Sequence, residues 1–525
     1  MRTCHRARLT ASLLTGAALI VGTASAQEIA TGIVFEDLNG NGLHDPGEPG
    51  VAGVAVSNGL DVVLTDDEGR YELPVDGDTI IFVRKPSGWA VPLDEDNLPQ
   101  FFYIHKPEGG PDFEFPTVPP TGPLPESISF PLERVEESNQ FSIIGLADPQ
   151  PRNYEQVLWV EDKVVNDMAR QEDIRFTIVH GDIVHNDLSL LEPWIDMARN
   201  LGHPIYNVIG NHDLNLADAS GPEDAGETFQ YYFGPEDFSW QSGDVHFVAM
   251  NSIKYHGHER GGYHTELDER QLEWLRNDLE TANPEKLLVI NMHSTFINQR
   301  GGRRMPGIDQ VLEMTKDRPA GVLVLNGHKH YTILHYYTEE DGWEGEADFF
   351  ELNQAVGSGR WWRGPKDYRG VPVAIQGDGT PQGYTIIRFD GTDYTYHYRG
   401  AGYPEDYQMR IFAPTEHTSG ENPERTLLAN IFYAPPTSEV EYSLNGGGWQ
   451  PMEYNRRPDP LTAGQIHGWP EDIELEWGGA GDAFHMWEVV LDEELPPGRS
   501  NRWDIRATKP NGQVVTGTRI FTTRE

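Results

Sequence analysis

The stretch FSIIGLADPQ (141–150) is an apolar run that ends on two polar residues, Asp148 and Gln150. Short apolar runs bounded by turn residues are typical of buried strands. Asp, Asn and His at the ends of successive buried strands form the pattern of a metal site. Four further stretches repeat this pattern: RFTIVHGD (175–182), PIYNVIGNHD (204–213), KLLVINMH (286–293) and GVLVLNGHKH (321–330).

Stretches with helical spacing lie between these runs, over 153–171, 187–201 and 267–282. Asp268 stands at the start of the third as an N-cap or first-turn acid. The stretch 229–252 predicts a strand, a loop and a second strand. We therefore expect an α/β domain with two central sheets and helices outside, whose motifs lie at the carboxyl ends of strands.

The chain has 525 residues, which predicts two to four domains. It carries 83 Asp and Glu against 40 Lys and Arg, a net charge of −43. Such a surface repels nucleic acid and anionic membranes, so we expect no bulk nucleic-acid binding. The acids are spread along the chain, which favours a solubility adaptation over an acidic tail.

The first 26 residues have the pattern of a secretory signal peptide. Arginines at positions 2, 6 and 8 precede the apolar run 9–22, and Ala24-Ser25-Ala26 offers small residues for cleavage before Gln27. A retained N-terminal anchor is the alternative. The single cysteine, Cys4, lies in this segment, so the mature chain would need no disulfide. We expect a secreted or periplasmic protein with no later membrane-spanning stretch.

Residues 27–106 predict an N-terminal β domain, and DLNGNGLHDPGE (37–48) within it has the spacing of a twelve-residue calcium loop. Gly42 takes the sharp-turn position. A solvated Asx-rich turn without an ion is the alternative, and a bound Ca²⁺ would be structural. The residues at the ligand positions are Asp37, Asn39, Asn41, the Leu43 carbonyl, Asp45 and Glu48. The domain resembles the prealbumin-like B-type repeat domains of bacterial surface proteins.

The remaining chain divides into three parts. Residues 107–138 predict a Pro-rich linker with a lead-in strand, and 139–402 the central domain. Residues 403–525 predict a C-terminal β-sandwich, with two strands around Asn511-Gly512. The expected architecture is a four-layer α/β/β/α sandwich flanked by two β-sandwich-like domains.

The order of the five motifs resembles the calcineurin-like metallophosphoesterase superfamily, whose pattern is D-x-H, GD, GNH[DE], an isolated His and GHxH. The flanking β domains resemble a bacterial subgroup with added N-terminal and C-terminal β domains. The resemblance implies two metals, with Asp148, His330 and Gln150 at the first, Asp182 bridging, and Asn211, His293 and His328 at the second. It also implies that His212 is the acid that protonates the leaving group, or a hydrogen-bond donor to the transferring phosphoryl group, and that Asp213 orients its ring.

Gln150 departs from the family pattern, which usually has His at this position. Its side-chain oxygen is a neutral and harder donor than imidazole, which favours Mn²⁺ or Mg²⁺ over zinc there. The expected cofactors are therefore two divalent ions among Mn, Fe, Zn and Mg, with Mn preferred. Whether Gln150 coordinates directly is open at this stage.

Weaker candidates surround these motifs. Arg300 and Arg303 could clamp phosphate, with a solvated loop as the alternative. Trp361, Trp362 and Arg363 suggest an aromatic platform for an organic leaving group, with packing of the Trp pair as the alternative. Two further sets could lie near the site or on the surface, namely His256, His258 and His264, and His185, Asn186 and Asp187.

The motifs predict a secreted bacterial hydrolase that cleaves phosphate esters with a hydroxide bound between two metals, with phosphodiesters favoured over phosphomonoesters. The chain offers no cysteine or serine nucleophile motif, so no covalent intermediate is needed. The alternative is a cell-surface or glycan-binding protein that uses its β domains, with a non-catalytic centre. Contact with a cell surface through the β domains is compatible with both hypotheses.

Overall fold

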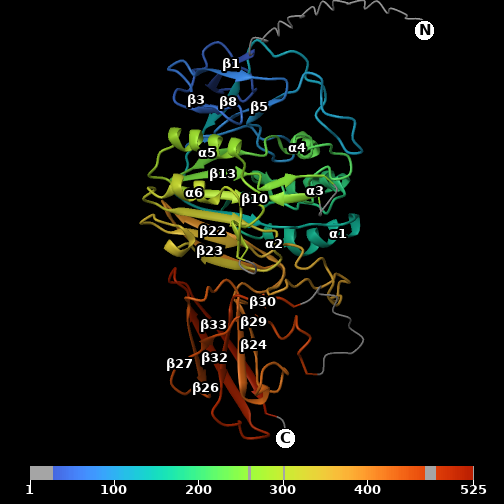
Figure 1. The fold of residues 1–525 in the computed structure, drawn as a ribbon, viewed down its shortest axis with the longest axis vertical. Helices are drawn as coiled ribbons and strands as arrows, with labels where there is room; N and C mark the ends of the chain where they lie inside the picture. The colour runs from blue at the N-terminus through green and yellow to red at the C-terminus, as the bar shows by residue number, and fades with distance from the viewer. Residues whose placement is uncertain (1–27, 258–261, 299–301, 468–479, 524–525) are drawn as a thin grey trace, which may run out of the picture.

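The computed structural model describes residues 28–257, 262–298, 302–467 and 480–523. It places three β-rich parts in chain order along one axis, with the N-terminal part in blue at one end and the C-terminal part in red at the other (Figure 1). The central part holds α1–α6 between them. None of the helices within the described ranges is both long and apolar enough to cross a membrane.

The N-terminal part consists of two four-stranded sheets. One has the order β4-β1-β8-β6, with β4 (Arg70–Val75), β1 (Glu28–Glu36), β8 (Phe130–Arg134) and β6 (Trp89–Ala90). The other has the order β3-β2-β5-β7, with β3 (Val62–Leu64), β2 (Ala55–Ser57), β5 (Thr79–Val83) and β7 (Phe102–His105).

The strand expected to lead into the central domain is β8, and it belongs to the N-terminal sheet. Val34, Phe35 and Glu36 of β1 pair with it in parallel. Its burial alternates along the strand, with Phe130 and Leu132 in the core. The Pro-rich segment before it therefore returns the chain to the first sheet rather than leaving that sheet.

The central part contains a five-stranded and a six-stranded sheet. The five-stranded order is β11-β10-β9-β22-β23, with β11 (Ile205–Val208), β10 (Ile174–His180), β9 (Gln140–Leu146), β22 (Gly383–Asp390) and β23 (Asp393–Gly400). The six-stranded order is β12-β13-β16-β19-β21-β20, with β12 (Phe238–Ser242), β13 (Val245–Met250), β16 (Leu287–Met292), β19 (Val322–Asn326), β21 (Phe349–Asn353) and β20 (Ile333–Tyr336).

Alternation along β9 shows how these two sheets pack. Phe141 and Ile143 join the core shared with the six-stranded sheet, whereas Ile144 and Leu146 join the core beneath the helices. The helices on that side are α1 (Tyr154–Val160), a π-helical turn (Glu161–Val165), α2 (Asn166–Met168) and α3 (Leu191–Ala198) with one 3₁₀ turn at each end (Leu188–Leu190, Arg199–Leu201).

The opposite face of the six-stranded sheet packs against α5 (Glu269–Thr281) and α6 (Ile308–Thr315). Asp268 caps α5 as predicted, because its carboxylate accepts the Gln271 N–H and the Gln271 side chain returns a bond to the Asp268 N–H. Two short hairpins and a 3₁₀ turn complete this part: β14 (Ile253–Tyr255) with β15 (Tyr263–Thr265), β17 (Ile297–Asn298) with β18 (Arg303–Arg304), and Glu339–Asp341.

The strand predicted at the start of 229–252 is wrong. Glu227–Phe233 form helix α4, ended by Gly234 at φ 79°. Phe229 and Phe233 lie four positions apart, so one helical face buries both rings. That burial outweighs the β propensity of the aromatic residues.

The C-terminal part has two four-stranded sheets that share one core. Their orders are β24-β25-β31-β28, with β24 (Met409–Phe412), β25 (Thr426–Ile431), β31 (Met486–Val490) and β28 (Glu453–Tyr454), and β27-β26-β32-β33, with β27 (Gln450–Pro451), β26 (Glu439–Leu444), β32 (Ser500–Thr508) and β33 (Val514–Thr522). The hairpin β29 (Arg457–Pro458) with β30 (Asp482–Ala483) and a 3₁₀ turn (Pro423–Arg425) lie beside them.

A buried polar network joins the C-terminal part to the central part. The Asp378 carboxylate accepts the Thr332 N–H at 2.6 Å and lies 3.0 Å from His485 Nε2. On the other side of the His485 ring, Nδ1 meets Asn430 Oδ1 at 2.5 Å. Asp378, Thr332, His485 and Asn430 are all fully buried, so these bonds compensate the cost of removing four polar groups from water.

The N-terminal part is joined to α5 by a buried arginine. Arg84 Nη1 lies 3.0 Å from Asp278 Oδ1, and Nη2 donates to the Thr281 carbonyl at 2.9 Å. The same carboxylate accepts from Ser239 and contacts His246 Nε2 at 2.6 Å. One guanidinium thus caps the end of α5 and neutralises a buried acid.

Replacing this arginine is expected to destabilise the protein strongly. Arg84→Ala removes the guanidinium that pairs with the buried Asp278 carboxylate, a loss of about 3–5 kcal/mol for a broken buried pair. Arg134→Ala is the matched control, since its ion pair with Glu36 is on the surface and contributes less than about 1 kcal/mol. Urea unfolding followed by tryptophan fluorescence measures both, and equal losses would contradict this account of the interface.

Candidate functional site

The five motifs meet at one edge of the two central sheets. β9, β10 and β11 are parallel neighbours, and so are β16 and β19, so their carboxyl ends point the same way. The first ligand residue of each motif lies within three residues of the end of its strand. The side chains brought to this edge are Asp148 and Gln150 after β9, Asp182 after β10, Asn211 and His212 after β11, His293 after β16, and His328 and His330 after β19.

Asp182, His293 and His328 form a compact cluster whose ligand atoms all lie within 4.8 Å of one another. His293 Nε2 is 3.3 Å from Asp182 Oδ1 and 3.1 Å from His328 Nδ1. Asn211 Oδ1 lies 3.2 Å from the same nitrogen. Three lone-pair atoms therefore surround one imidazole nitrogen.

Asp148 and His330 form a second pair beside this cluster. His330 Nε2 lies 3.4 Å from Asp148 Oδ1, which is buried without a hydrogen bond to any described residue. The other oxygen, Oδ2, accepts the backbone N–H of His328 at 2.8 Å. A buried carboxylate oxygen with no donor is the kind of atom that a cation satisfies.

Backbone carbonyls fix both metal-facing imidazoles. His293 Nδ1 donates to the His180 carbonyl at 2.8 Å, and His330 Nδ1 donates to the Gly359 carbonyl at 2.5 Å. With the proton held on Nδ1, each Nε2 presents a lone pair towards the carboxylates. This is the orientation that metal-binding histidines usually receive from neighbouring groups.

The motif backbone is strained where it carries these side chains. Non-glycine residues rarely adopt a positive φ, and strain of this kind gathers at functional sites. Here the positive φ angles lie between 45° and 71°, at Asp148, Gln150, Asp182, His328 and His330.

Two motif glycines allow the close approach of ligand groups. A Cβ on Gly181 would lie 2.6 Å from His293 Nδ1, and one on Gly327 would lie 2.2 Å from Asp148 Oδ2. Each glycine precedes a predicted ligand, so the GD and GH dipeptides leave room for a ligand delivered by another strand.

The charges in the cluster depend on one another. Burial alone would raise the pKa of Asp182, but the neighbouring His293 and His212 lower it well below its usual value. Burial acts against protonation of His293, yet Asp182 raises the pKa of His293 to about 9. The pKa of His328 falls well below its usual value because the ring is buried next to Lys329 and His293. The Asp182 carboxylate thus favours a positive charge beside His293.

These residues fit two divalent cations by their chemistry. The set offers carboxylate oxygens, an amide oxygen and imidazole nitrogens with exposed lone pairs. The two Asp182 oxygens face different neighbours, since Oδ1 lies near His293 and Oδ2 accepts the Gln150 amide N–H at 3.0 Å.

Gln150, a predicted metal ligand, is oriented differently from that prediction. Trp361 Nε1 lies 2.8 Å from Gln150 Oε1. An indole N–H only donates, so the acceptor must be the amide oxygen, and the amide nitrogen faces Asp182. In this structure Gln150 is therefore a hydrogen-bond donor to Asp182 and not an oxygen ligand.

Asn186, and not the predicted Asp213, orients His212. His212 Nδ1 lies 2.6 Å from Asn186 Oδ1, and the His185 ring packs on the His212 ring at 4.0 Å between centroids. The Asp213 carboxylate accepts the N–H groups of Val184 and Gly210, at 3.2 and 2.9 Å. It points inward because the loops after β10 and β11 each leave one of these buried backbone donors to be satisfied.

The remaining candidates are divided between the site and its surroundings. Trp361 touches the His330 ring at 4.7 Å, whereas Trp362 is buried against Trp159 at 6.0 Å, as in the packing alternative. Arg303 is exposed on β18. Arg300 and His258 lie outside the described residues, His256 and His264 stack on each other at 5.5 Å, and Asp187 caps a 3₁₀ turn.

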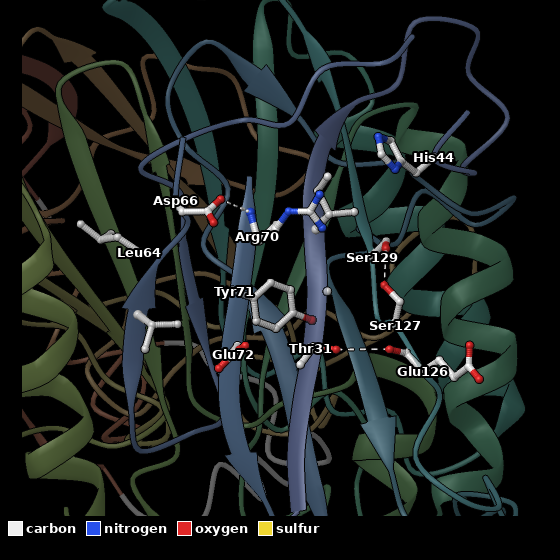
Figure 2. Close-up of a pocket in the computed structure, with 13 residues that line it drawn as sticks. Thr31, His44, Leu64, Asp66, Arg70, Tyr71, Glu72, Glu126, Ser127 and Ser129 are labelled. Atoms are coloured by element: carbon white, nitrogen blue, oxygen red, sulfur yellow. Dashed lines mark hydrogen bonds between the residues drawn. The ribbon is translucent and has the colours of Figure 1, made fainter. Parts of the chain in front are cut away.

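An open hollow of about 860 Å³ lies in the N-terminal part, away from this cluster. Figure 2 shows Tyr71 near its centre, with Arg70, Asp66 and Glu72 around it. The Tyr71 ring is 3% exposed, and its hydroxyl donates to the Ile128 carbonyl at 2.7 Å. The hollow therefore offers mixed charges but no exposed aromatic face of the kind that stacks on sugars.

Three family models match the chain in succession. Residues 141–332 match the model of the calcineurin-like phosphoesterase, residues 38–117 that of the N terminal of calcineurin-like phosphoesterase, and residues 351–514 that of its C terminal. A chain with this motif set is a metal-dependent phosphoesterase, a hydrolase of phosphate esters. The chain belongs to the calcineurin-like phosphoesterases and carries the N-terminal and C-terminal domains of that family.

Comparison with solved structures gives distant likenesses. A dimetal phosphatase from Danio rerio is 13% identical over 50% of this chain and 96% of its own, with a TM-score of 0.33. The purple acid phosphatase PPD1 from yellow lupin seeds (Lupinus luteus) is 11% identical over 66% of both chains, with a TM-score of 0.36. The spore cortex lytic enzyme SleM of Clostridium perfringens is 12% identical over 74% of this chain and 100% of its own, at 0.20. No curated protein sequence matches the chain.

Asn186→Ala is expected to reduce metal-dependent phosphoesterase activity by about ten- to a hundredfold, the range found when a residue that orients an active-site group is lost. The loss should fall mainly on kcat, because His212 keeps its place but loses its fixed ring orientation. Metal content should stay unchanged, since Asn186 does not touch the cluster of Asp182, His293 and His328.

The control for this variant is Asn200→Ala, whose amide bonds only to carbonyls at the end of α3. Asn186→Asp should recover part of the activity, because it keeps an oxygen opposite His212 Nδ1. An unchanged kcat in Asn186→Ala would show that this hydrogen bond does not position His212 for the reaction.

Proposed function

We propose that this protein is a secreted two-metal phosphoesterase that prefers phosphodiesters over phosphomonoesters. Asp148, Asp182 and His330 would hold one cation, and Asp182, Asn211, His293 and His328 the other. One observation carries the proposal. His293 Nε2 is surrounded by Asp182 Oδ1, Asn211 Oδ1 and His328 Nδ1, at 3.1–3.3 Å, a buried group of lone pairs that needs a positive charge at its centre.

Two divalent cations held there would lower the pKa of a water nucleophile and neutralise charge on the phosphoryl group. In this reaction His212 gives the proton on its Nε2 to the leaving oxygen, while its Nδ1–H is donated to Asn186 Oδ1. Burial lowers the pKa of His212, while the charge of Asp182 acts in the opposite direction. Manganese remains the preferred ion, since Asp and Asn oxygens make up much of the ligand set.

The finer architecture and location belong to the same proposal. We take the central part as a four-layer α/β/β/α sandwich, with β-sandwich domains on both sides. The signal-like segment 1–26 lies outside the described residues, and secretion stays a prediction from the sequence. Contact with a cell surface through the β domains likewise stays a prediction.

Asp182→Asn and His293→Ala are expected to lower hydrolysis of bis(p-nitrophenyl) phosphate in Mn²⁺ by more than a hundredfold, above the loss typical of residues that only orient a ligand. Both variants should also bind fewer metal ions per chain by elemental analysis, because each removes a group at the centre of the cluster. His467→Ala, an exposed histidine in the C-terminal part, is the control. Full metal content and full activity in both variants would refute the two-metal assignment.

The loop 37–48 is the proposed calcium site, although it also satisfies itself without an ion. Asp37 accepts the N–H groups of Gly40 and Gly42 at 2.7 and 2.8 Å. Asn39 and Asn41 donate to Asp45 Oδ2 at 2.9 and 2.8 Å. These bonds gather the ligand side chains on one side of the loop, and they equally fit the Asx-turn alternative.

If calcium binds this loop, millimolar CaCl₂ should raise the melting temperature of the chelator-treated protein by a few degrees, since a ligand that binds only the folded state stabilises it. Asp37→Ala should abolish that shift, and Asp66→Ala, in a different turn of the same domain, should keep it. Identical melting curves with CaCl₂ and with EDTA would favour the ion-free turn.

A further inference from the structure

Three arginines gather around Trp361, next to the candidate metal centre. The guanidinium carbons of Arg152, Arg363 and Arg360 lie 5.3, 5.3 and 6.0 Å from the centre of the indole ring. The same ring contacts His330 at 4.7 Å and donates to Gln150. Three guanidinium groups therefore lie beside the proposed ligands in a chain of net charge −43.

The position of Arg152 is unfavourable for its positive charge. Burial, and then the neighbouring charge of Arg363, lower the pKa of Arg152. Its Nε is buried and has no hydrogen-bond partner among the described residues. The side chain also forms no ion pair with a described carboxylate. A half-buried guanidinium that lies beside a second one, and that has no ion pair with a described carboxylate, points to an anion from outside the protein.

The arginines lie close to the candidate metal ligands, and this closeness indicates which molecule would carry the anion. Trp361 links the two groups, because one edge of the indole binds Gln150, itself bonded to Asp182, while arginines surround the ring. An anion between Arg152 and Arg363 would lie next to an ester held at the metals. It would thus belong to the same small molecule.

We propose that Arg152, Arg363 and Trp361 bind a second phosphate group of the substrate, so that the enzyme prefers phosphate esters that carry two phosphates. This inference rests on the proposed function. Guanidinium forks match phosphate oxygens in geometry, and two of them balance a doubly charged group better than a singly charged carboxylate. Trp361 orients the guanidiniums by cation–π contact and sets the direction in which they point.

The first experiment compares two substrates with the same scissile bond. Thymidine 5′-(p-nitrophenyl phosphate) and its 3′-phosphorylated form release the same p-nitrophenolate, and only the second carries an additional phosphate. The manganese-loaded full chain should hydrolyse the 3′-phosphorylated form with a kcat/KM about tenfold higher, as one charged contact predicts. The preference should shrink as NaCl rises, because salt screens partly exposed charges.

Arg152→Ala and Arg363→Ala should each reduce this ratio towards one. Arg152→Lys should keep part of it, since the charge remains and the fork is lost. Arg276→Ala, an exposed arginine on α5, removes the same charge elsewhere and should leave the ratio as in the wild type. A wild-type ratio near one, with both substrates cleaved, overturns the second-phosphate site and leaves the phosphoesterase proposal standing.

A binding experiment separates the two proposals further. Propane-1,3-bisphosphonate and propylphosphonate contain no hydrolysable ester, and calorimetry measures their affinity for the metal-loaded chain. The bisphosphonate should bind about tenfold more tightly, and Arg152→Ala should remove that difference. Arginine-dependent binding without hydrolysis of any ester would support the phosphate site and refute the phosphoesterase proposal. Equal affinities for the two phosphonates would overturn the phosphate site.

Discussion

The crowding of lone pairs around His293 Nε2 is the constraint on which the site depends. Three acceptor atoms within 3.3 Å of one buried nitrogen repel one another unless a proton or a metal ion lies between them. Against the effect of burial, Asp182 raises the pKa of His293, which favours a positive charge at this place. A cation bound among these atoms would supply that positive charge in place of a proton on His293.

Backbone hydrogen bonds between the motif loops stabilise this cluster. The Asp148 and Gln150 N–H groups donate to the carbonyls of Gly181 and Asp182, at 3.2 and 3.1 Å. The Gly327 N–H donates to the His293 carbonyl at 3.0 Å. Each motif thus fixes the backbone of another, which compensates part of the strain of the positive φ angles. These backbone hydrogen bonds keep the acceptor atoms around His293 close together despite their mutual repulsion.

The sequence predicts this frame well because its signals are local. Apolar runs followed by Asp, Asn or His give the strands and their polar ends, and the Asp268 capping box lies within four residues. The misassigned segment 229–233 shows the limit, since its aromatic residues favour a strand and only packing across the fold makes them helical. Tertiary contacts overrule propensity at such places.

Side-chain partners from distant segments are harder to predict. Trp361 and Trp362 are adjacent and both have positive φ, yet one contacts His330 and the other packs on Trp159. Nothing in the dipeptide distinguishes them. Arg152 lies only two positions after Gln150, but its significance arises from Arg363, more than two hundred residues later. The pairing of His212 with Asn186 has the same origin, because Asn186 comes from the loop after β10 whereas Asp213 binds backbone N–H groups.

The C-terminal part also supports the metal site, because it holds the segment that follows β21 in the central part. This segment supplies the Gly359 carbonyl that fixes His330, and the Gly377 N–H donates to the His330 carbonyl at 3.0 Å. Asp378, the next residue, is held by His485 of the C-terminal part and in turn holds Thr332. The loop that carries His330 is thus supported on both sides by a segment whose own position depends on another domain. A catalytic domain with the C-terminal part removed would expose Asp378 and lose this support, so the added β domain acts as a structural component of the metal centre.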